Sequence, residues 1–202
     1  MVNSMWQDAE KFFCEDRFMA PLIKTGESCI IRKSPKSKYF VDILEAIVSQ
    51  QLSGKAATTI FGRVEVLCKG SITPEAVLAL SATKLRGAGL SYAKIKYVKD
   101  LSDRVKTKEL KLESLGKLSD EEVIDELVKV KGIGRWTAEM FLMFSLGRPD
   151  VFPVDDLGIS KGFEKVTGKK WNKVNSAKFA EKNWKPYRTV ASWYLWRSLE
   201  NK

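Results

Sequence analysis

Apolar side chains recur every three or four residues along most of the chain, and strict alternation of apolar and polar residues is scarce. This spacing places apolar residues on one face of an α-helix, whereas alternation would indicate strands. A first helix is predicted to open at Ser4 and to end before Pro21. This helix would carry the aromatic side chains of Trp6, Phe12 and Phe13. The pattern predicts an all-α fold.

Capping residues mark several of the helices that follow. Residues 40–67 form a long apolar helical stretch, interrupted near 49–54. Hydroxyl side chains that precede helical stretches are typical N-caps, and a glutamate three residues later completes a capping box. The N-caps predicted in this way are Thr73 (before Pro74), Ser81, Ser91 and Ser119 (with Glu122).

The helix behind Ser119 should bury its apolar side chains, and an aromatic helix should follow it. The side chains expected in the core are Val123, Ile124, Leu127 and Val128. Residues 135–147, RWTAEMFLMFSLG, are predicted to form the aromatic helix, which would end at Gly147.

Two corners between predicted helices share a Gly-x-Gly sequence, in LRGAGLSYA (85–93) and VKGIGRWTA (130–138). Paired glycines permit a tight turn with positive φ and close backbone approach. In the second corner, backbone amides and the positive end of a helix dipole would point to one place, between Lys131 and Arg135. Such a corner favours phosphate binding without base recognition.

The amino-acid composition restricts the kinds of catalytic site, metal site and binding partner that the chain can have. The 202 residues include 35 Lys and Arg against 25 Asp and Glu, a net charge of +10, and no histidine. The absence of histidine excludes Ser-His-Asp triads, Cys-His dyads and His-based zinc sites. Three cysteines without a CxxC pair indicate reduced thiols rather than a disulfide framework or cluster. A folded chain this basic indicates a polyanionic partner, nucleic acid before an anionic membrane surface.

No membrane association is expected. No apolar run approaches the roughly 18 residues of a membrane span, and the acidic, amphipathic start is unlike a signal peptide. We therefore expect a soluble, intracellular protein.

Two adjacent acids stand out in DVFPVDDLGISKGF (150–163). Pro153 breaks the chain before them, so Asp155 is expected to be the N-cap of a new helix. Asp156 would then present its carboxylate near the phosphate-binding corner. In so basic a protein, this placement favours a chemical role for Asp156.

The sequences KGIGRWTAEM and DVFPVDDLGI resemble the signature of the helix–hairpin–helix, Gly/Pro-Asp superfamily of DNA glycosylases. The likeness is greatest to its 3-methyladenine DNA glycosylase II (AlkA-like) branch. AIVSQQLSGKAA (46–57), GLSYAKIKYVKDLS (89–102) and WKPYRTVASWYLWR (184–197) resemble further stretches of that branch in the same order. The resemblance implies two helical subdomains with an active-site cleft between them and no N-terminal β domain.

The resemblance also implies roles for single residues. Asp156 matches the catalytic aspartate. Trp136 and Trp196 match aromatic walls of the base pocket, with Met140 and Asp155 beside the substrate. Trp136 stands where bifunctional relatives carry a Schiff-base lysine, which implies a monofunctional enzyme. The matching DNA-contact positions, with Gln51 and Leu52 as the wedge that fills the gap left by a flipped base, are Gln51, Leu52, Ser91, Lys131, Gly132, Ile133, Gly134, Arg135 and Thr137.

No cofactor is implied beyond a structural Na⁺ or K⁺ ion. In relatives, backbone carbonyls at the positions of Val128, Val130 and Ile133 hold such an ion. The expected domains are a helix and basic connector at 1–38, which pack on the C-terminal helical subdomain, and a glycosylase domain at 39–202. The expected partner is double-stranded DNA containing damaged bases, bound by a monomer. The expected location is the cytoplasm with the nucleoid, or the nucleus of a eukaryote.

The implied reaction flips out an alkylated purine and hydrolyses its N-glycosidic bond, which leaves an abasic site. Bases of the 3-methyladenine or 7-methylguanine type carry positive charge and leave without a general acid, which suits a chain without histidine. Two alternatives stay open at this point. One is a bifunctional glycosylase and lyase that uses another lysine such as Lys131, and the other is a non-enzymatic DNA-binding module.

Overall fold

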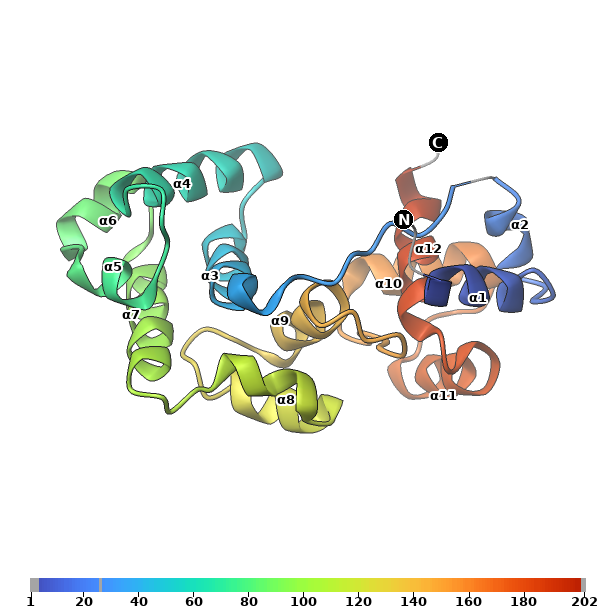
Figure 1. The fold of residues 1–202 in the computed structure, drawn as a ribbon. Helices are drawn as coiled ribbons and strands as arrows, with labels where there is room; N and C mark the ends of the chain where they lie inside the picture. Colours follow the sequence, from blue (N-terminus) through green and yellow to red (C-terminus); the bar gives the residue numbers. More distant parts are fainter. Residues whose placement is uncertain (1–3, 26, 201–202) are drawn as a thin grey trace. The chain divides into compact units, whose positions relative to one another are not determined.

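The computed structural model describes residues 4–25 and 27–200, and every regular element in these ranges is a helix (Figure 1). The predicted all-α fold is confirmed. The chain divides into two compact units, described here one at a time. Unit 1 takes the chain up to Lys33 and from Leu142 onward, and unit 2 takes Ser34–Phe141. The predicted domains 1–38 and 39–202 stay a prediction.

Unit 2 is a set of helices whose neighbours along the chain mostly pack together. The long helix α7 contacts α3, α5 and α6, while α4 lies against α3 and α6 (Figure 1). The elements of unit 2 are the 3-10 helices η1 (Lys36–Lys38) and η2 (Leu112–Lys117) and the α-helices α3 (Tyr39–Ser49), α4 (Gly54–Leu67), α5 (Pro74–Ala79), α6 (Ala82–Ala88), α7 (Tyr92–Lys106), α8 (Asp120–Leu127) and α9 (Arg135–Met140).

The four predicted N-caps of unit 2 are confirmed. The side-chain oxygens of Thr73, Ser81 and Ser91 each accept a hydrogen bond from the backbone N–H three residues on, at 3.2 Å. The Ser119 hydroxyl accepts from the Glu122 N–H, and the Glu122 carboxylate accepts from the Ser119 N–H at 2.7 Å. These bonds satisfy backbone donors that the first turn of a helix leaves unpaired.

Unit 1 joins the first helices to the last ones. Its α-helices are α1 (Ser4–Phe13), α2 (Ala20–Ile23), α10 (Leu157–Thr167), α11 (Lys173–Trp184) and α12 (Arg188–Glu200). Helix α12 contacts α1, α10 and α11. The aromatic core of the unit includes Trp6, Phe13, Phe163, Trp184 and Tyr194, each nearly inaccessible to solvent.

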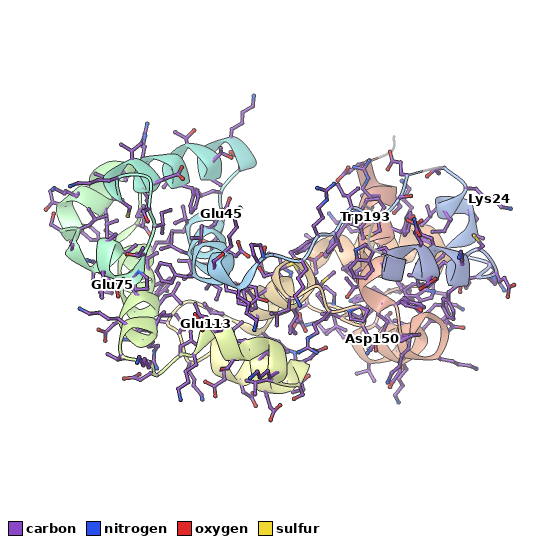
Figure 2. All side chains as sticks on the ribbon, viewed as in Figure 1. Lys24, Glu45, Glu75, Glu113, Asp150 and Trp193 are labelled. Atoms are coloured by element: carbon purple, nitrogen blue, oxygen red, sulfur yellow. The ribbon has the colours of Figure 1, made fainter. Side chains whose placement is uncertain are left out.

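Polar contacts hold the segment before α10 against the start of α12. The Arg188 guanidinium donates to both carboxylate oxygens of Asp150, at 2.7 and 2.9 Å (Figure 2 labels Asp150). The Thr189 hydroxyl accepts from the Val151 N–H at 3.0 Å and donates to the Arg148 carbonyl at 2.6 Å. The chain that leads into the Asp155–Asp156 pair is therefore fixed on α12.

Three details differ from the sequence-based expectations. The first helix ends before Pro21 as expected, but already at Phe13, and Pro21 lies in the first turn of the separate helix α2, which starts at Ala20. The predicted helix 135–147 is α9 followed by a π-helix, η3 (Phe141–Ser145). Val128 was expected in the core but is 41% exposed, because it is the C-cap of α8 and lies past the last full turn. Within the described residues, no helix has the length and apolarity needed to span a membrane.

Candidate active site and DNA-contact elements

The N-cap of α10 is Asp156, so the expectation that Asp155 caps this helix is wrong. Asp156 Oδ1 accepts from the Ile159 N–H at 2.8 Å. The Asp156 N–H donates to the Pro153 carbonyl at 3.1 Å. That bond closes a turn over residues 153–156 and makes the helix begin one residue later than expected. Asp155 instead forms an ion pair with Lys173.

The Asp156 carboxylate also meets an aromatic side chain. Trp196, on α12, donates from its indole Nε1 to Asp156 Oδ1 at 2.9 Å. Phe144 stacks on Trp196 with ring centroids 6.1 Å apart and an angle of 27° between the planes. The structure therefore brings together two residues that the sequence pointed to, Asp156 and Trp196, within unit 1.

Sequence reasoning missed Phe144 and Gly158 at this place. Phe144 lies in the apolar run FLMFS, where nothing separates it from a core residue, yet it is 40% exposed. A Cβ on Gly158 would lie 2.7 Å from Cδ1 of Trp196 and 3.0 Å from Asp156 Oδ1. A glycine in the first turn of a helix is a signal that could have been used, because it lowers helix propensity and often has a packing reason.

The second Gly-x-Gly corner, residues 128–134, is the hairpin between α8 and α9. Gly132 has φ of +81°, and a Cβ there would lie 2.1 Å from the Tyr97 ring. The Gln50 side chain donates to the Gly132 carbonyl at 2.9 Å, and the Lys131 N–H donates to Asp100 Oδ2 at 3.0 Å. The backbone of this hairpin is thus held by α7 and by the end of α3.

Lys131, in the hairpin, and Arg135, directly after it, already have anionic partners. Lys131 Nζ lies 3.3 Å from Asp100, and Arg135 pairs with Glu121 at 2.9 Å and with Glu139 at 3.2 Å. Burial would raise the pKa of Asp100, but hydrogen bonds from Lys131 and Arg104 hold it below its usual value. A DNA phosphate would compete with these carboxylates, so the predicted phosphate contacts of Lys131 and Arg135 stay predictions.

The predicted wedge residues lie on the loop between α3 and α4, which we call the wedge loop (residues 50–53). Gln51 is exposed with φ of +57°, and Leu52 is 38% exposed. The Lys94 ammonium donates to the carbonyls of Val48 and Gln50, at 2.7 and 2.6 Å. Burial lowers the pKa of Lys94. The loop therefore presents exposed side chains on a fixed backbone.

The remaining predicted residues are spread over unit 2. Trp136 on α9 is 43% exposed, Met140 is half-buried, and Ser91 is the exposed N-cap of α7. Thr137 and Ile133 are buried, so their side chains do not reach the surface. Asp156 and Trp196, in contrast, belong to unit 1.

Among the described residues, no group of three His, Cys, Asp or Glu side chains could hold a metal ion. An ion at the hairpin would rely on the carbonyls of Val128, Val130 and Ile133. Neutral oxygen donors of this kind suit a hard cation such as Na⁺ or K⁺ rather than a transition metal.

Solved structures share this fold over nearly the whole chain. A DNA-3-methyladenine glycosidase from Bacillus halodurans superposes with a TM-score of 0.84 and 36% identity, over 95% of this chain and 88% of that one. A 3-methyladenine DNA glycosylase from Schizosaccharomyces pombe, in complex with abasic DNA, superposes with a TM-score of 0.81 and 33% identity, over 96% and 97% of the chains.

Sequence comparison gives the same result. A protein named DNA-3-methyladenine glycosylase 1, from Schizosaccharomyces pombe, is 36% identical over 177 residues, which cover 83% of this chain and 75% of that protein. The family model for HhH-GPD superfamily base excision DNA repair proteins matches residues 44–188. The chain therefore belongs to the HhH-GPD superfamily of base excision DNA repair proteins.

Proposed function

We propose that this protein is a monofunctional DNA-3-methyladenine glycosylase, of type II, that removes alkylated purines from double-stranded DNA. The observation that carries the proposal is the Asp156 carboxylate, which the Ile159 N–H and the Trp196 indole hold at one end of α10. The names of the relatives support the substrate class. The abasic DNA in the Schizosaccharomyces pombe complex is the kind of product that such a reaction leaves.

The proposed reaction needs little from the protein beyond one carboxylate and a pocket. The target nucleotide rotates out of the duplex, at a cost of a few kcal/mol. The C1′–N bond breaks, and its electron pair cancels the positive charge of a 3-methyladenine or 7-methylguanine base. The Asp156 carboxylate stabilises the cationic sugar, and a water oxygen then bonds to C1′ while its proton passes to that carboxylate.

Aromatic side chains such as tryptophan are suited to binding a positively charged base. A cation over an indole face gains about 0.5–2 kcal/mol. The resemblance proposes Trp136 and Trp196 as walls that contact the flipped base, with Met140 beside it, and Gln51 with Leu52 would fill the gap in the duplex. A Na⁺ or K⁺ ion held by the carbonyls of Val128, Val130 and Ile133 would add positive charge beside a phosphate.

The working form is proposed to be a monomer on damaged DNA. It would act in the cytoplasm on the nucleoid, or in the nucleus of a eukaryote.

The first test is Asp156→Asn. Asparagine is also a good N-cap, so α10 should keep its first turn. We expect release of 7-methylguanine from methylated duplex DNA to fall to background. DNA affinity should hold or rise, because a negative charge near phosphate is removed. Base release is measured by mass analysis, and affinity by fluorescence anisotropy.

The matched control for this test is Asp16→Asn. Asp16 lies in unit 1, and its carboxylate also accepts two backbone N–H bonds, from Phe18 and Met19. It should release bases like the wild type. If Asp156→Asn released bases at the wild-type rate, Asp156 would not be the catalytic residue. A wild type that bound DNA and released no base would favour the non-enzymatic module.

A lyase reaction would need an uncharged amine as nucleophile. The nearest lysine in sequence to the position of Trp136 is Lys131, and its side-chain nitrogen is already engaged in an ion pair with Asp100, at 3.3 Å. We therefore expect no covalent adduct when borohydride is added to the protein on DNA with an abasic site. An adduct that Lys131→Met abolishes would establish the bifunctional alternative instead.

A further inference from the structure

Trp196 reaches Asp156 with the edge of its indole ring. The Nε1–H group points to Asp156 Oδ1 at 2.9 Å, and the same oxygen accepts from the Ile159 N–H at 2.8 Å. One donor comes from α12 and the other from α10. Two donors that converge on one oxygen restrict rotation of the carboxyl group, and hydrogen bonds to a charged acceptor are the stronger kind.

The surroundings of the ring favour this contact. Gly158 leaves the space that the indole edge occupies, because a Cβ there would lie 2.7 Å from Cδ1 and 2.9 Å from Nε1 of Trp196. Phe144 stacks on Trp196 at 6.1 Å between centroids. The first turn of α10 and the neighbouring aromatic ring thus together set where the indole N–H points.

We propose that Trp196 is a positioning residue that holds the Asp156 carboxylate in its reactive orientation through the indole N–H. This role goes beyond a wall that stacks on the flipped base, and it rests on the proposed glycosylase function. A donor that is already in place lets the carboxylate meet the developing sugar cation without first reorganising.

The kinetic test is Trp196→Phe, which keeps an aromatic face and removes the N–H donor. Loss of one hydrogen bond to a charged group corresponds to a rate about 10- to 100-fold slower. We expect this loss in single-turnover release of 7-methylguanine at saturating protein, with the Kd for the damaged duplex unchanged. A pocket wall alone would instead change the Kd and the preference among damaged bases.

The matched control is Trp193→Phe. Trp193 lies on the same helix, is 9% exposed and packs on Tyr194 (Figure 2 labels Trp193). The chemical change is identical, and base release should stay at the wild-type rate. Wild-type kinetics for Trp196→Phe, or a weaker Kd with an unchanged rate, would overturn the positioning role.

Gly158→Ala tests the Trp196–Asp156 hydrogen bond by a steric change. Alanine favours helix more than glycine does, but its Cβ would force the indole edge away from Asp156. We expect a rate loss of the same order as for Trp196→Phe, and urea unfolding shows whether the variant is folded. A folded Gly158→Ala variant with wild-type kinetics would contradict the proposal.

A spectroscopic test does not depend on the glycosylase function. The chain has six tryptophans, and Trp196→Phe identifies the indole ¹⁵N–¹H signal of Trp196 by its loss. Asp156→Asn exchanges a charged acceptor for a neutral one, so this signal should move upfield while the other five stay. An unmoved signal would overturn the inference even if bases are released. If the signal moves but the wild-type protein releases no base, the Trp196–Asp156 hydrogen bond is confirmed and the proposed glycosylase function is refuted.

Discussion

Gly132 and Gly134, two residues apart in one hairpin, have different surroundings. At Gly132, positive φ and the Tyr97 ring leave no room for a Cβ, whereas a Cβ on Gly134 would meet no atom within 4 Å. Gly132 is therefore required by the fold itself. The fold does not require a glycine at position 134. A substitution of Gly134 that weakens DNA binding would therefore indicate that DNA approaches the backbone at this position.

We expect Gly134→Ala to keep the wild-type free energy of unfolding and to weaken binding to damaged and undamaged DNA about equally. A phosphate that approaches the hairpin backbone closely would meet the added methyl group. Gly132→Ala should instead lose stability, by roughly 1–3 kcal/mol, because the backbone is strained and the Tyr97 ring must move. Urea unfolding and anisotropy titrations with both DNAs measure these effects. Unchanged DNA affinity in Gly134→Ala would remove the hairpin from the DNA-contact surface.

Residue-level expectations held where a local pattern decides the outcome. Ser119 and Glu122 form their capping box because both partners lie within three residues of each other. Asp156, and not Asp155, caps α10 because the turn from Pro153 makes the helix begin one residue later, and Asp155 pairs with Lys173, 18 residues further on. Sequence spacing contains neither fact.

At the scale of elements, the wedge loop depends on a lysine from another helix. Lys94 of α7 donates to two carbonyls at the end of α3, so its ammonium acts as a C-cap for that helix. Gln50 then links the same loop to the hairpin through the Gly132 carbonyl. Two predicted DNA-contact elements, which lie about 80 residues apart in sequence, are thus joined by one side chain.

We expect Lys94→Met to slow base release from duplex DNA about tenfold, because loss of its two bonds frees the loop that carries Gln51 and Leu52. Release from a damaged single strand, which needs no wedge, should change little. Single-turnover assays on both substrates measure this. Lys96→Met is the control, since it removes the same charge from an exposed position of α7. Equal effects of the two variants would show that only charge matters.

Helix periodicity made most elements of this chain predictable, but not every interruption of a helical stretch. The break between α3 and α4 was visible at Ser53 and Gly54, whereas the π-helix at Phe141–Ser145 follows an unbroken apolar run. The side chains of such a run fit either helix type, and only packing around them selects one.

At the scale of the whole molecule, the net charge of +10 is not spread evenly along the chain. Residues 161–185 hold eight lysines against two glutamates, so this stretch of unit 1 concentrates positive charge. At the hairpin, in contrast, Lys131 and Arg135 pair with carboxylates. These ion pairs join residues that are distant in sequence, so the sequence alone does not predict them.

Unit 1 is built from both ends of the described chain, with unit 2 between them in sequence. Helix α1 packs on α12, more than 170 residues later, while all of unit 2 lies within one continuous stretch. During synthesis, unit 2 can complete its contacts before α12 has left the ribosome, whereas α1 must wait for its partner. The Asp156–Trp196 bond, which needs α12, therefore cannot form until that helix has been synthesised.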